Sequence, residues 1–104
     1  MLARKFHIPL REGLHLKGRN SRGRFFAVKE SKNELPYSRF AIVIGKKNQK
    51  GAVERNKIKR FVYDWIRKSG LQEQPGKDFL IIALAPLGQI AKVEIEKDLQ
   101  KIIK

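Results

Sequence analysis

Two short, almost entirely apolar runs flank one amphipathic segment with helical periodicity, and this order constrains the fold more than any other feature. The runs cover residues 39–45 and 78–85, and the segment between them covers 52–69. A run that is apolar at nearly every position predicts a strand covered on both faces. Two such strands joined through a helix form a βαβ unit, in which the strands lie parallel. The sequence therefore predicts an α+β or α/β fold in which helices cover one small sheet.

The rest of the chain predicts one more strand, one more helix and an irregular arm. We expect the strand over 24–30 and the helix over 91–104, where isoleucines and leucines recur at helical spacing. Residues 1–20 follow neither periodicity, so we expect an irregular arm with a helical turn near 10–17. A chain of 104 residues has room for one domain, which consists here of this arm and a core over 22–104.

The positive charge is concentrated in the first two-thirds of the chain. The net charge is +14, and residues 1–70 hold 19 Lys and Arg but five acids, whereas the charges of residues 71–104 cancel. A field of this size attracts polyanions. Nucleic acid is the expected partner. The alternatives are an anionic membrane surface, which is rarer, and a merely solubilising surface, which seldom needs so uneven a balance.

The helix over 52–69 separates its apolar and basic residues. At about 100° per residue, one side gathers apolar residues, which predict the core face: Ile58, Phe61, Val62, Trp65 and Ile66. The other side gathers three cations, an amide and a phenol without an acid, namely Asn56, Lys59, Arg60, Tyr63 and Arg67. Guanidinium groups suit phosphate oxygens and base edges, an amide can bond a 2′-hydroxyl, and a phenol can stack on a base. A solvated helix face usually mixes charges of both signs, so this side predicts RNA binding.

Two further basic segments are candidates for phosphate contacts. The loop before the helix carries Lys46, Lys47 and Lys50, which fit a phosphate site and an ordinary surface loop equally well. Arg24 precedes two adjacent aromatic residues, Phe25 and Phe26. Strand alternation would turn one of these rings into the core and leave the other to stack on a base or to pack beneath the arm.

The chain shows no constellation of residues for catalysis of its own. The absence of cysteine excludes disulfides, cysteine-ligated zinc and thiol catalysis. The carboxylates of the basic portion are scattered, whereas two-metal phosphodiester cleavage needs them clustered, so we expect no catalytic residue, metal site or cofactor. Glu94 and Asp98, spaced i, i+4 beside lysines, are typical of surface charge patterning. Short apolar runs and an N-terminus without a signal-like core predict a cytoplasmic protein that does not span a membrane.

Two segments around the basic helix resemble the bacterial ribonuclease P protein family. Residues 39–47 read Arg-Phe-Ala-Ile-Val-Ile-Gly-Lys-Lys, and residues 51–60 read Gly-Ala-Val-Glu-Arg-Asn-Lys-Ile-Lys-Arg. The family has an apolar strand that ends in Lys-Lys, a loop with Gly-x-Ala-Val and a helix with Arg-Asn-Arg/Lys-x-Lys-Arg. The matching helix positions are Arg55, Asn56, Lys57, Lys59 and Arg60. The resemblance covers residues 18–104. It departs at Tyr63, where the family usually has arginine, and in the arm, where the aromatic spacing differs.

The resemblance implies a fold and a division of labour. The fold is an α/β sandwich like the second domain of ribosomal protein S5, with a mixed sheet and an unusual left-handed crossover in its βαβ unit. A partner RNA forms the active site of this endoribonuclease and holds the magnesium ions, and the protein binds that RNA through the basic helix. The protein also contacts the single-stranded 5′ leader of precursor tRNA, which the complex removes, and no further protein partner is required. Because the arm departs from the family pattern, we expect the leader contacts on the sheet and the loop: Arg24, Phe26, Lys46, Lys47 and Lys50.

A small ribosomal protein that only supports ribosomal RNA would have the same composition. The two hypotheses differ in whether the protein stimulates a catalytic RNA.

Overall fold

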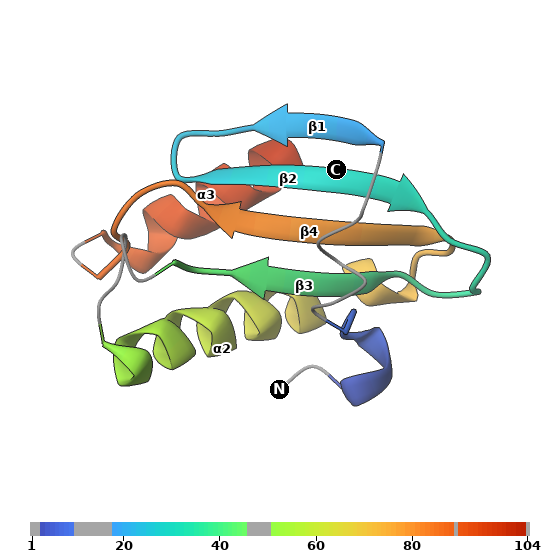
Figure 1. The fold of residues 1–104 in the computed structure, drawn as a ribbon, viewed down its shortest axis with the longest axis horizontal. Helices are drawn as coiled ribbons and strands as arrows, with labels where there is room; N and C mark the ends of the chain where they lie inside the picture. Colours follow the sequence, from blue (N-terminus) through green and yellow to red (C-terminus); the bar gives the residue numbers. More distant parts are fainter. Residues whose placement is uncertain (1–2, 10–17, 46–50, 89, 104) are drawn as a thin grey trace.

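The computed structural model describes residues 3–9, 18–45, 51–88 and 90–103 and contains one mixed sheet (Figure 1). The strands follow the spatial order β1-β2-β4-β3, with β1 and β2 antiparallel to their neighbours and β3 parallel to β4. The elements in chain order are a 3-10 turn η1 (Arg4–Phe6), β1 (Arg19–Arg22), β2 (Phe26–Lys32), β3 (Arg39–Val43), α2 (Ala52–Ser69), a second 3-10 turn η2 (Leu71–Glu73), β4 (Lys77–Ala83) and α3 (Lys92–Ile102).

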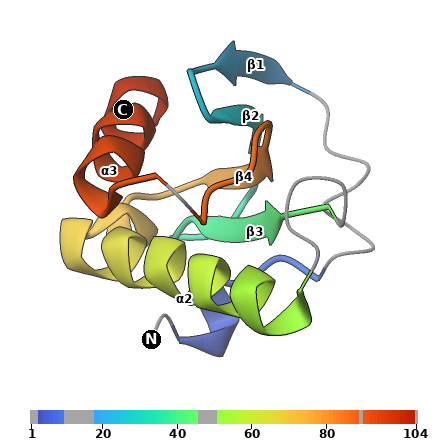
Figure 2. The ribbon, with the colours of Figure 1, turned by 90° about the vertical axis from the view of Figure 1, so that its left-hand side faces the viewer.

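Strands β3 and β4 form the predicted βαβ unit through α2. Both strands point the same way in Figure 1, and Figure 2 shows α2 and α3 on one side of the sheet. For a viewer on the helix side of the sheet, with the strands running upwards, β4 lies to the left of β3. The crossover is therefore left-handed, as the family resemblance implied and against the general preference for right-handed connections.

The main core lies between the helices and the sheet. Val62 and Ile66 of α2 are fully buried, and Trp65 is 9% exposed. They pack in one cluster with alternate residues of the strands and with α3, including Val28, Phe40, Ile42, Phe79, Ile81 and Leu99. The predicted core face of α2 is confirmed, because its apolar residues meet the sheet while the basic residues stand on the other side.

The opposite face of the β3–β4 pair carries a smaller apolar cluster. Ala41 and Leu80 are buried there together with Ile8 of the N-terminal segment. The backbone N–H of Ile8 donates to the carbonyl of Phe40 at 2.9 Å, and His7 pairs with Phe40 in a parallel bridge, so this segment lies along the outer edge of β3. Both faces of these strands are thus covered in part, which explains why their sequences do not alternate.

Several boundaries differ from the prediction. Helix α2 covers the predicted residues, whereas β2 begins two residues later than expected and α3 is shorter at both ends. Strand β1 overlaps the end of the arm that was expected to be irregular and was not predicted, because its residues are polar and give no hydrophobic signal. The helical turn expected near 10–17 lies outside the described residues.

The interpretation of Asp98 as a surface charge is wrong. Asp98 is 6% exposed, and its carboxylate accepts three backbone N–H bonds, from Arg24 at 2.7 Å, Phe25 at 2.9 Å and Phe26 at 3.2 Å. A Cβ atom on Gly23 would lie 2.5 Å from Asp98 Oδ1, so the turn needs glycine at this position. A carboxylate of α3 therefore fixes the turn between β1 and β2.

Replacement of Asp98 should destabilise the protein measurably. In Asp98→Ala, buried N–H groups of the turn lose their acceptor, which should cost on the order of 1–3 kcal/mol in the free energy of unfolding. Urea denaturation measures this loss. Glu96→Ala on the same helix is the control and should change the free energy by less than about 0.5 kcal/mol. Equal unfolding midpoints for the two variants would contradict the assigned role of Asp98.

Candidate nucleic-acid interface

Helix α2 presents the candidate interface, and its ends are defined by glycines. The helix follows Gly51, whose carbonyl accepts the first helical bond from Arg55 N–H at 3.0 Å. It ends at Gly70, which has a φ of 77° and donates its N–H to the carbonyls of Ile66 and Arg67. Glycine adopts this left-handed conformation without the steric cost of a Cβ atom. Because the apolar side of α2 is packed on the sheet, the rotation of the helix about its axis is fixed.

The basic face of α2 consists of Asn56, Lys59, Arg60, Tyr63 and Arg67. Asn56, Arg60 and Arg67 are exposed, and Lys59 is half-buried. Arg67 Nε lies 4.0 Å from Asp64 Oδ1 on the flank, which is a long contact between two partly exposed groups. Such a pair contributes little to stability, so Arg67 stays accessible to a stronger anionic ligand.

The two other residues of the sequence motif lie beside the basic face. Arg55 is half-buried, and Lys57 is exposed on the side of α2 that faces α3. Lys57 Nζ lies 3.6 Å from Glu54 Oε1 in a solvent-exposed i, i+3 pair. The motif is therefore divided between two sides of the helix.

Tyr63 is held between the helix and the outer edge of β3. Its side chain is half-buried, and its ring stacks on His7 with centroids 4.3 Å apart and planes inclined by 27°. Burial raises the pKa of Tyr63 above 10.0, opposed in part by a hydrogen bond from the Ile42 backbone. One face of this ring thus anchors the N-terminal segment and is not open to a base.

Two members of the predicted leader-binding set, Arg24 and Phe26, lie among the described residues, and these two do not share a surface. Arg24 is exposed, with its guanidinium carbon 5.1 Å from the centroid of the Phe25 ring. Phe26 is fully buried in the main core, so its assignment as a leader contact is wrong. The expected alternation of inward and outward side chains does not apply to Phe25 and Phe26, because Phe25 lies in the turn before β2. Both rings pack into the core. Lys46, Lys47 and Lys50 lie outside the described residues.

A second group of cations lies at the other edge of the sheet and includes two arginines of the basic stretch before Phe25. Arg19 and Arg22 are exposed on β1, and with Lys101 of α3 they line a hollow of about 300 Å³ that also contains Glu30. Glu30 is paired with Lys77 at 2.9 Å. The arginine spacing was visible in the sequence, but the polar strand that holds these residues gave no signal.

The described residues contain no group of three or more His, Asp or Glu side chains that could hold a metal ion. Among the described residues, no helix is both long and apolar enough to cross a membrane.

A mixed sheet with two helices on one face and a cationic face on one helix defines this chain as a small α+β nucleic-acid-binding protein. The family model described as Ribonuclease P matches residues 13–104. The ribonuclease P protein component of Bacillus cereus is 36% identical over 89 residues, which are 85% of this chain and 76% of that protein. The Pseudomonas putida component is 35% identical over 79% of this chain and 60% of its own length.

Solved structures agree with these matches. The ribonuclease P protein of Thermotoga maritima superimposes with a TM-score of 0.80 at 26% identity, covering 91% of this chain and 92% of that one. The Staphylococcus aureus protein gives 0.82 at 26% identity, covering 94% and 92%. The chain belongs to the ribonuclease P protein family.

Tyr63 should make folding stability depend on alkaline pH. A folded-state pKa above the unfolded value of about 10 means that neutral Tyr63 stabilises the fold below pH 10. This contribution is lost as the pH rises from about 10 through the folded pKa. Tyr63→Phe should therefore lose less stability than the wild type across that window, although it lacks one hydrogen bond at pH 7. Urea denaturation at a series of pH values tests this, and parallel pH profiles for the two proteins would contradict it.

Proposed function

We propose that this chain is the RNA-binding subunit of ribonuclease P, which assists a catalytic RNA in removing the 5′ leader from precursor tRNA. The observation that carries the proposal is the acid-free basic face of α2, within the matched family motif. The planar guanidinium groups of arginines on a rigid helix bind phosphate oxygens with little loss of side-chain conformational freedom. Docked beside the catalytic RNA, a protein of charge +14 would offset the phosphate repulsion between that RNA and its precursor.

The proposal assigns the catalytic centre and its magnesium ions to the RNA. The buried carboxylates of the described residues support it, because each already has structural partners. Asp98 holds the turn before β2, and Asp78 accepts bonds from Arg39 at 2.7 and 3.0 Å and from Asn33 at 2.7 Å. Within this proposal the protein acts in the cytoplasm, needs no cofactor of its own and requires no other protein partner.

Because Phe26 is buried, we place the proposed leader contact on another surface of the sheet. The sheet face opposite the helices presents Val43 and Ile82, which are half-buried beside the smaller apolar cluster. Apolar surface of this kind suits unstacked bases of a single strand. Lys46 and Lys47 follow β3 in the sequence, so they remain the proposed phosphate contacts of the leader.

Reconstitution tests the proposed function directly. Purified protein, a bacterial ribonuclease P RNA and precursor tRNA are mixed at low magnesium, and each is omitted in turn. We expect cleavage at the leader junction when all three are present and none with the protein alone. The protein should also strengthen the binding of precursor tRNA more than that of mature tRNA. Cleavage by protein alone, or no stimulation of a compatible RNA at any salt concentration, would overturn the proposal, and the second outcome would favour a ribosomal role.

The basic face should account for much of the affinity for RNA. The double variant Arg60→Gln/Arg67→Gln should bind ribonuclease P RNA more weakly, and the slope of log K against log salt should fall by roughly 0.7–0.9 per lost phosphate contact. Filter binding over a range of salt concentrations measures both quantities. Lys68→Gln, on the flank of the same helix, is the control for a general loss of charge. An unchanged slope in a folded double variant would remove this face from the interface.

A further inference from the structure

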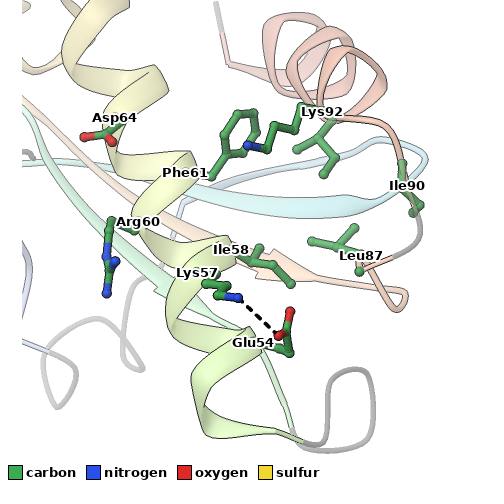
Figure 3. Close-up of a pocket in the computed structure, with 11 residues that line it drawn as sticks. Glu54, Lys57, Ile58, Arg60, Phe61, Asp64, Leu87, Ile90 and Lys92 are labelled. Atoms are coloured by element: carbon green, nitrogen blue, oxygen red, sulfur yellow. Dashed lines mark ion pairs between the residues drawn. The ribbon is translucent and has the colours of Figure 1, made fainter.

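A groove separates the first half of α2 from the loop and helix that follow β4 (Figure 3). Its volume is about 410 Å³. The floor is apolar and is formed mainly by Ile58, Phe61, Leu87, Ile90 and Ile95. Phe61 and Ile90 are half-buried, so apolar surface remains accessible within the groove.

The rim of the groove has a surplus of unpaired positive charge. Glu54 is paired with Lys57, and Asp64 lies beside Arg67. Arg60 and Lys92 are exposed and form no ion pair with a described residue. Lys92 Nζ instead lies 5.5 Å from the centroid of the Phe61 ring, so a cation and an aromatic ring stand together at the mouth.

We propose that this groove binds one unpaired nucleotide of the RNA that is held on the basic face of α2. The base enters beside Phe61, and its phosphate is held by Lys92. Aromatic rings stack on bases of any sequence, and lysine binds phosphate as a point charge. This proposal rests on the proposed function, because the RNA strand must already lie on α2.

Arg60 connects the groove with the basic face. It lines the groove, yet Figure 3 shows its guanidinium directed away from Lys92, towards the other side of α2. Arg60 therefore borders both the groove and the basic face, so a strand bound on that face would pass beside the groove. An apolar peptide would fill the floor equally well but would gain nothing from Arg60 and Lys92, so the charge favours RNA.

A single introduced cysteine can locate RNA at the groove, because the natural chain has none. Ile90→Cys, labelled with a short photo-crosslinker, should react with one unpaired nucleotide of ribonuclease P RNA. Val93→Cys is the matched control, since Val93 is 55% exposed on α3 but does not line the groove. Crosslinks at both positions with equal yield, or at neither, would overturn the proposal.

The affinity for RNA gives a second, independent measurement. Lys92→Gln should weaken binding about 3- to 10-fold and reduce the salt slope by roughly 0.7, the value for one single-strand contact. Lys97→Gln, an exposed lysine of α3 outside the groove, should leave both unchanged. If Arg60→Gln/Arg67→Gln weakens binding but Lys92→Gln does not, the groove proposal fails and the proposed function stands. If neither variant changes binding, both fail.

Discussion

The packing of α2 across the parallel strands β3 and β4 is the contact on which the rest of the molecule depends. Phe40 and Phe79 are register partners near the start of this pair of strands, and their rings stack with centroids 5.1 Å apart. Val62, Trp65 and Ile66 join the same cluster, and burial of each side chain stabilises the fold by roughly 1.5–3 kcal/mol. Like charges spaced i, i+4 along α2, such as Arg55 and Lys59, cost only about 0.2–0.5 kcal/mol per pair. The core can therefore hold a cationic face towards solvent without losing the helix.

The N-terminal segment and the helix stabilise each other through the outer edge of β3. Ile8 donates a backbone hydrogen bond to Phe40, and His7 stacks on Tyr63. An edge strand without such a neighbour would expose its N–H and C=O groups to pairing with other chains. Tyr63, which marks the departure from the family pattern, thus holds the N-terminal segment against the helix.

The sequence predicted those elements whose signal is local and missed those that depend on distant residues. Helix α2 was predicted over its observed residues because its periodicity and the glycines at its ends lie within one segment. Strand β1 is polar on an edge, so no hydrophobic pattern marks it. The burial of Asp98 depends on a turn 72–74 residues away in the chain, which no pattern around Asp98 reveals. Phe26 was misplaced for the same reason, since the turn held by Asp98 sets where β2 begins.

The two buried aspartates lie too far apart to share a pair of catalytic metal ions. Asp78 lies near the start of β4, whereas the turn held by Asp98 leads into Phe26, the register partner of Ala83 at the other end of that strand. Five residues of strand separate the two ends by about 16 Å, whereas paired catalytic metals lie about 3.5–4 Å apart. Each carboxylate also accepts hydrogen bonds from several donors, and the stability of the fold depends on these bonds. Moving either one towards a shared metal would leave buried N–H or guanidinium groups without an acceptor, so the fold itself opposes a two-metal centre built from these acids.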